Sequence, residues 1–286
     1  SDPSVSADND CYSLAGATYG LFSDQDCTAQ VATLTTDRDG NTETVEVRAG
    51  TLYIKELSAP TGFKLDSTVY TLTVKAGETA TLKVSDTPKA TSTEIELFKI
   101  DMETGKAVAQ GAASLEGAEF VWNYYDGYYT KENLPSEPTR TWTTKTVAET
   151  DRDGTTHYVT GLDNAYKVSG DDFYVMDGKN VLPLGTLTVQ ESKSPTGYLL
   201  EGAYLQAEGS EEQIKGLYVT QITEDGDLAV LSGSNQFSVS DQVIRGGVKI
   251  QKRDLETGDT KAQGGATLKD TSFEIVFLND NPVLVE

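Results

Sequence analysis

Short stretches of alternating apolar and polar residues run along most of this chain. Alternation places every second side chain on one face, which is typical of half-buried β-strands. It is clear in Thr51–Lys55, Val69–Val74 and Phe237–Ser240, and no segment has a sustained helical period. Asp-Gly pairs, which favour tight hairpin turns, separate many of these stretches and stand at 39–40, 126–127, 153–154, 177–178 and 225–226. The pattern predicts an all-β protein.

Repeated motifs indicate how the chain is divided. Each of three motifs occurs twice: Lys-x-Asp-x-Glu-Thr-Gly at 99–105 and 252–258, Glu-x-x-x-Pro-Thr-Gly-aromatic at 56–63 and 191–198, and Val-Ser-Asp at 84–86 and 239–241. Their order predicts one domain at residues 1–88, a second at 89–244, and the start of a third, truncated unit at 245–286. Short polar connections such as Thr87–Ser92 predict units strung end to end.

Charge and composition exclude several classes of function. The 286 residues include 23 Lys and Arg against 45 Asp and Glu, a formal net charge of −22, which argues against nucleic acid and anionic membrane surfaces as partners. No apolar run is long enough for a membrane span, so no membrane insertion is expected. One histidine, His157, and two cysteines cannot supply the usual zinc sites, so we expect no metal.

The two cysteines, Cys11 and Cys27, both lie near the start of the chain. Their spacing fits neither a redox CxxC pair nor a zinc knuckle, and it predicts a local disulfide formed outside the cytosol. Two free thiols are the alternative.

Three charged residues are predicted to point into the core. Each shares a strand face with apolar neighbours: Lys99 with Ile95 and Leu97, Glu191 with Leu187 and Val189, and Asp241 with Phe237 and Val239. Isolated buried charges are costly, so we expect the three to gather. Burial favours the uncharged forms of amines and carboxyl groups, and a neutral amine beside a protonated carboxyl can form an amide without a cofactor.

Two alternatives stay open at this site. The three side chains could remain an unreacted ion triad, and Asn235, on the same strand face as Asp241, could replace it as the acceptor.

These motifs together resemble the Cna protein B-type domains of Gram-positive surface adhesins and SpaA-type pilins. The resemblance rests on Lys99–Gly105 followed by Gly117–Phe120, on Glu191–Tyr198, and on the closing Val239–Asp241. It implies tandem prealbumin-like β-sandwiches, the second with a large insertion. It also implies that Lys99 is the amine, Glu191 the proton shuttle of the "E-box", and Asp241 the acceptor of a self-formed isopeptide bond.

The first unit departs from this pattern. Glu56 and Asp86 stand at the E-box and acceptor positions, but no lysine precedes Lys55, so these residues cannot complete a bond. In this unit, a disulfide between Cys11 and Cys27 would provide the covalent link in place of the isopeptide bond. Because the family includes adhesins with thioesters, a thioester at Cys11 is a further alternative.

In the third segment, Lys252 shares its strand face with Val248 and Ile250. This segment contains neither an E-box glutamate nor a closing acid. We therefore expect Lys252 to stay an unreacted amine, in strands that are incompletely paired.

The insertion of the second unit is rich in aromatic residues. It predicts either a small satellite core or an adhesive face for host glycan or extracellular-matrix protein; the candidates for that face are Trp122, Tyr124, Tyr125, Tyr128 and Tyr129.

The resemblance implies a secreted stalk or backbone module at the cell wall of a Gram-positive bacterium. Attachment to the wall or to a pilus by sortase would use regions not in this chain. Bond formation happens once, so the chain is not expected to be a turnover enzyme; a ligand-binding adhesin module is the alternative.

Overall fold

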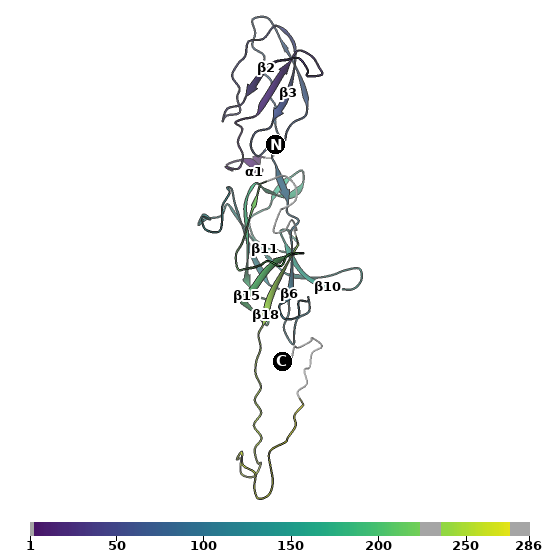
Figure 1. Cartoon of the computed structure of the whole chain (residues 1–286), viewed down its shortest axis with the longest axis vertical. Coiled ribbons are helices and arrows are strands. Elements are labelled where there is room, and N and C mark those ends of the chain that lie inside the picture. The colour runs from purple at the N-terminus through teal and green to yellow at the C-terminus, as the bar shows by residue number, and fades with distance from the viewer. Residues whose placement is uncertain (1–2, 224–235, 275–286) are drawn as a thin grey trace.

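The computed structural model describes residues 3–223 and 236–274, and in these ranges the chain is almost entirely β-structure. Figure 1 shows an elongated molecule with three successive parts. We name them the N-terminal unit (residues 3–88), the central unit (residues 89–243) and the C-terminal segment (residues 244–274). The four-residue α1 (Pro3–Ser6) is the one helix in the described ranges, so the predicted all-β class is confirmed.

The N-terminal unit is built on one antiparallel sheet with the strand order β2-β1-β3-β4. Its strands are β1 (Thr18–Phe22), β2 (Gln30–Thr35), β3 (Gly50–Ser58) and β4 (Val69–Val74). Alternate residues of β3 are buried, as the sequence pattern predicts. Four partly buried side chains from outside the sheet pack on its apolar face: Val45, Val47, Leu82 and Val84.

The central unit contains two large sheets and one small sheet. The six-stranded sheet has the order β16-β15-β18-β6-β10-β9, and in it only β18 and β6 run parallel to each other. Its strands are β6 (Glu96–Asp101), β9 (Val147–Thr150), β10 (Thr156–Gly161), β15 (Tyr198–Ala207), β16 (Gln213–Lys215) and β18 (Gln236–Val243).

The second large sheet has five antiparallel strands in the order β11-β8-β7-β14-β17. They are β7 (Glu119–Tyr125), β8 (Arg140–Lys145), β11 (Lys167–Gly170), β14 (Gly185–Lys193) and β17 (Tyr218–Ile222). The small sheet has the order β12-β13-β5, with β5 (Ala90–Ser92), β12 (Tyr174–Met176) and β13 (Lys179–Pro183).

The insertion does not form a satellite core. Trp122 and Trp142 are fully buried and belong to the same apolar cluster as Leu97 and Val239 of the sandwich. The Trp142 ring stacks on Phe173 with ring centroids 5.4 Å apart. The insertion therefore extends the main core, because its aromatic side chains add to one continuous apolar volume.

Residues 3–12 pack against the central unit, where Figure 1 places α1 between the two sheet bodies. Val5 is 1% exposed within the central core. The buried Asn9 Nδ2 donates to the Tyr124 hydroxyl at 2.8 Å and to the Leu184 carbonyl at 3.1 Å. We call residues 3–12 the junction segment, because it joins the two units by buried contacts.

The connection at Thr87–Ser92 was predicted to be a polar linker, and that prediction is wrong. Residues 90–92 form β5, which pairs with β13, and Ala90 and Thr91 are buried. Tyr12 donates its hydroxyl to the Lys89 carbonyl at 2.6 Å and accepts the Leu184 amide at 2.9 Å. The two units thus meet through a packed joint.

The predicted disulfide is also wrong, since both cysteines are free. Cys11 is buried in the junction segment before β1, and burial raises the pKa of its thiol. Cys27 lies in the turn beyond the other end of β1. At roughly 3.3 Å per residue the strand separates its two ends by on the order of 13 Å, whereas a disulfide needs Cα atoms within about 7 Å.

The C-terminal segment extends from the central unit at the end opposite the N-terminal unit (Figure 1). Residues 244–274 contribute no strand to any sheet. Val248, Ile250 and Leu255 are 77%, 50% and 103% exposed. Its apolar positions therefore have no core of their own among the described residues.

Candidate functional site

Two facing sheets bring the predicted triad together inside the central unit. Lys99 lies on β6 and Asp241 on the neighbouring parallel strand β18, where Lys99 is registered with Val239. Glu191 lies on β14 of the opposite sheet, paired with Phe120. The inward positions predicted from strand parity are confirmed, because the three side chains are among the buried residues.

The lysine amine lies between the two carboxyl groups. Lys99 Nζ is 2.6 Å from Glu191 Oε2, to which it donates a hydrogen bond, and 2.7 Å from Asp241 Oδ1. The Lys99 and Asp241 side chains have no exposed surface, and that of Glu191 is 2% exposed. Phe120 covers the amine, with its ring centroid 5.9 Å from Nζ. Water therefore has almost no access to the reacting atoms.

Burial shifts both acids towards their protonated forms. It raises the pKa of Glu191 to about 8, although the Lys99 amine acts in the opposite direction. It also raises the pKa of Asp241, with Lys99 again opposing. The Glu191 and Asp241 carboxyl groups also lie close enough to each other to interact, so the two acids and the amine form one buried group. A protonated carboxyl facing a buried amine is the pairing that amide formation requires.

The N-terminal unit holds the counterpart acids without a lysine. Glu56, on β3, is 1% exposed, and Asp86 is partly buried. Burial raises the pKa of Asp86 to about 6, and the neighbouring Glu56 carboxyl adds to this shift. Glu56 Oε1 and Asp86 Oδ1 are both buried, and the two carboxyl groups interact with each other.

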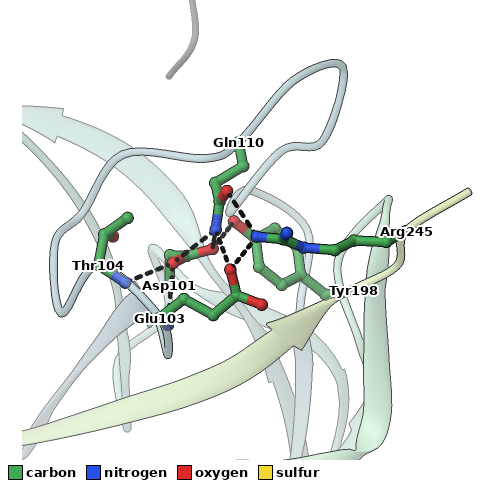
Figure 2. A network of polar contacts seen from close by, with 6 residues as sticks. All are labelled: Asp101, Glu103, Thr104, Gln110, Tyr198 and Arg245. Atoms are coloured by element: carbon green, nitrogen blue, oxygen red, sulfur yellow. Dashed lines mark hydrogen bonds and ion pairs between the residues drawn. The ribbon is translucent and has the colours of Figure 1, made fainter. Parts of the chain in front are cut away.

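A second buried cluster, which we did not predict from the sequence, lies at the end of β6 (Figure 2). Asp101 is fully buried and accepts hydrogen bonds from Gln110 Nε2, at 3.2 and 3.1 Å, and from the Tyr198 hydroxyl at 2.9 Å. Arg245, just beyond β18, forms an ion pair with Glu103. We call these residues the exit cluster. The sequence did carry an indication of this cluster. Lys99 and Asp101 are two residues apart on one strand, so both side chains lie on its inward face.

The C-terminal segment repeats the loop of the exit cluster. Asp254 accepts the Glu256 and Thr257 amides at 2.9 and 3.1 Å, and Gln263 Nε2 contacts Asp254 at 3.2 Å. The Asp and Thr-Gly of the repeated motif therefore shape a turn after the lysine strand. Lys252 itself is exposed.

The proposed aromatic ligand face is not a surface. Trp122 and Tyr124 are fully buried and Tyr125 is 6% exposed, because their strand β7 lies inside its sheet. Tyr128 is 43% exposed and Tyr129 is partly buried against Tyr125. The prediction that these five residues form one adhesive face is therefore wrong. The alternative acceptor Asn235 lies outside the described residues.

Across residues 3–223 and 236–274, no helix is long and apolar enough to cross a membrane. Over the same ranges, no group of three or more His, Cys, Asp or Glu side chains is placed to hold a metal ion.

The family model described as SpaA, a prealbumin-like fold domain, matches residues 6–88. The N-terminal unit is thus a SpaA-type prealbumin-like domain, which confirms the resemblance and the fold class predicted from the sequence. No curated protein matches the sequence.

Solved structures similar to this chain include a Bacillus anthracis protein and a pilus adhesin fragment. The Bacillus anthracis TIE protein is 22% identical, with a TM-score of 0.46, over 82% of this chain and 32% of that protein. A C-terminal fragment of the pilus adhesin SpaC from Lactobacillus rhamnosus GG is 16% identical, with a TM-score of 0.38, over 86% of this chain and 94% of the fragment. This chain spans about a third of the TIE protein. Since both TM-scores are below 0.5, the fold of the central unit rests on its own strand topology.

Proposed function

We propose that this chain is a structural stalk or backbone module of a Gram-positive surface adhesin or pilin, stabilised by an isopeptide bond between Lys99 and Asp241. The single observation that carries the proposal is the buried Lys99 amine, 2.7 Å from Asp241 Oδ1 and 2.6 Å from Glu191 Oε2. The SpaA-type domain at residues 6–88 supports the wider assignment.

The bond forms in one balanced condensation. The neutral Lys99 amine attacks Cγ of the protonated Asp241 carboxyl, so that a C–N bond forms. Glu191 takes a proton from the nitrogen and returns one to the departing hydroxyl, and the C–O bond then breaks to release water. Atoms and charges balance without a cofactor. Because the product is part of the chain, the reaction occurs once in each molecule.

The packed joint favours a mechanical role over a flexible tether. The junction segment and β5 bury side chains between the two units, and the cross-link would tie β6 to β18, the neighbouring parallel strand at the end of the central unit. We place the division between tandem B-type units near residues 88 and 244. On this proposal the protein is secreted and attached to the cell wall.

Intact-protein mass under denaturing conditions tests the bond. We expect a mass below the sequence value by one water molecule, and the full sequence mass for Lys99→Ala. Asp241→Asn keeps the geometry and should lose ammonia in place of water, while Lys193→Ala, which removes an exposed ion pair, should keep the water deficit. A full sequence mass for the unmodified chain, or a deficit that persists in Lys99→Ala, would overturn the proposal.

A further inference from the structure

The alternating pattern of β18 does not by itself fix how far this strand is shifted along β6. Every second residue from Phe237 to Val243 is buried, so a shift of two residues would keep the same face inward. Such a shift would move Asp241 by about 7 Å, since each residue of a parallel strand advances the chain by about 3.3 Å. The 2.7 Å contact between Asp241 Oδ1 and Lys99 Nζ therefore depends on contacts that set the register.

Backbone contacts at the end of β18 contribute to this register. Asp241 is registered with Asp101 of β6, and the Met102 amide donates a hydrogen bond to the Asp241 carbonyl at 3.0 Å. On the opposite side of β18, the Ile244 amide donates to the carbonyl of Gly197, the residue before β15, at 2.7 Å. The end of β18 is therefore tied to both of its neighbours.

The exit cluster presents two acids beside this end of β18. Asp101 accepts hydrogen bonds from the Glu103 and Thr104 amides at 3.1 and 2.8 Å. Gln110 Nε2 contacts both carboxyl groups, that of Asp101 at 3.1 Å and that of Glu103 at 3.0 Å. These contacts fix the Glu103 carboxyl in the loop that follows β6.

The loop after β6 takes its shape from local sequence. In the C-terminal segment the same motif makes the same contacts, because Gln263 Nε2 lies 3.2 Å from Asp254 Oδ1 and 3.0 Å from Glu256 Oε2. Both contacts fall within residues 254–263. The loop after β6 can therefore form before β18 has taken its place beside it.

Arg245 connects this loop to β18. It lies just beyond the strand, and Figure 2 shows its side chain reaching Glu103 and Gln110. Its guanidinium forms an ion pair with Glu103 and donates to Gln110 Oε1 at 3.5 Å. Because these contacts require Arg245 to lie level with the loop, they favour one register among those that the alternation allows.

We propose that Arg245 is a positioning residue for the bond between Lys99 and Asp241: its ion pair with Glu103 holds β18 in the register that places Asp241 beside the Lys99 amine. The inference rests on the proposed function, since it concerns how the acceptor of that bond is placed. Arg245 acts through the backbone of β18. A misplacement of about 1 Å can slow a reaction by about 100-fold, so a loss of register control should be visible in the rate.

The rate of bond formation in the full chain tests this role. Chains made by cell-free synthesis are quenched in acid at intervals, and intact mass gives the fraction that has lost one water. We expect Arg245→Ala to slow the loss by about 10-fold or more without changing the final deficit, and Arg245→Lys, which keeps the charge, to recover most of the rate. Arg253→Ala, which removes an exposed arginine of the C-terminal segment, should match the unaltered chain.

A double variant tests whether the effect comes from the ion pair. Glu103→Gln should slow the reaction as much as Arg245→Ala does, and the chain with both changes should be no slower than either, because both break one contact. Fully additive slowing would overturn the assignment to this pair.

Hydrogen exchange separates positioning from a general loss of stability. In the Lys99→Ala chain, where position 99 cannot react, adding Arg245→Ala should speed exchange of the Met102 and Ile244 amides by about 10-fold. The amides of β14, in the opposite sheet, should keep their rates. Faster exchange throughout β14 would overturn the proposal, because the slower reaction would then come from general destabilisation.

The mass measurement distinguishes this inference from the proposed bond. A water deficit that forms equally fast in Arg245→Ala and Arg253→Ala overturns the role of Arg245 and leaves the bond in place. A full sequence mass for the unaltered chain overturns the bond itself, and with it the reaction that Arg245 would serve.

Discussion

The N-terminal and central units share a sheet order and a buried glutamate, but they differ in the layer that faces this sheet. In the central unit β6 joins β10 and β18 into one sheet, and Phe237 and Val239 are each 2% exposed. In the N-terminal unit the counterparts Leu82 and Val84 are only partly buried and form no strand. In the central unit, β6 thus completes the second layer as a sheet.

The same strand decides whether the acids have a partner. β6 supplies Lys99 to Glu191 and Asp241, whereas Glu56 and Asp86 face each other without an amine. In the central unit, sheet closure and the cross-linking site thus depend on the same element, because strand parity fixes Lys99 on the face that the sheet buries.

The largest effect should come from making the central unit resemble the N-terminal unit at its reactive site. Lys99→Ala removes the proposed cross-link, which closes about 140 residues and is worth about 5 kcal/mol in the chain-entropy treatment used for disulfides. Calorimetry should show the central unit melting much earlier. Lys193→Ala is the control and should change stability by less than about 1 kcal/mol. Equal melting of Lys99→Ala and the unaltered chain would contradict the comparison.

The joint between the units should give the next largest effect. Asn9→Ala removes side-chain hydrogen bonds to Tyr124 and Leu184 and should cost about 1–3 kcal/mol, because buried polar groups lose their partner. Small-angle scattering should show a broader range of orientations between the units. Asp10→Ala, at an exposed neighbour, should change neither measurement, and a rigid Asn9→Ala protein would refute the packed joint.

The unpaired acids should make the two units respond differently to pH. Burial raises the pKa of Asp86 to about 6 from an ordinary value of 3.8, so the folded state binds the proton more tightly than the unfolded state. The stability contributed by this proton is present at low pH and is lost as pH rises through about 6. The melting temperature of the N-terminal unit should therefore fall over this window. Asp86→Asn should flatten the change, and an unchanged slope would exclude Asp86 as its source.

The smallest effect concerns the end of the central unit. The ion pair between Arg245 and Glu103 holds the Arg245 side chain there. Limited trypsin digestion should cut first after Lys249, Lys252 or Arg253 in the exposed segment, and later after Arg245. Glu103→Ala should bring the Arg245 cut forward. Cleavage after Arg245 first in the unaltered chain would show that the exit cluster gives no protection.

Strand parity and turn chemistry were enough to predict the all-β class and the inward direction of Lys99, Glu191 and Asp241. The disulfide and the aromatic face could not be predicted reliably, because both depended on distances through space. Cys11 and Cys27 are near in sequence, but the extended strand β1 lies between them and separates the two cysteines in space. Trp122 and Tyr124 are aromatic residues of a strand that has neighbours on both sides and apolar layers around it.

The sequence by itself determined which residues alternate inward, where the repeated motifs begin, and that the N-terminal unit has two acids without a lysine. These properties are local, because the period of a strand and the chemistry of a turn depend on a few adjacent residues. Only the tertiary structure decided that β6 pairs with both β10 and β18, that the junction segment packs on the central unit, and that Arg245 closes the exit cluster. Each of these contacts joins residues that are far apart in the chain. Local sequence patterns are compatible with several pairings of such residues, and only long-range packing selects one of them.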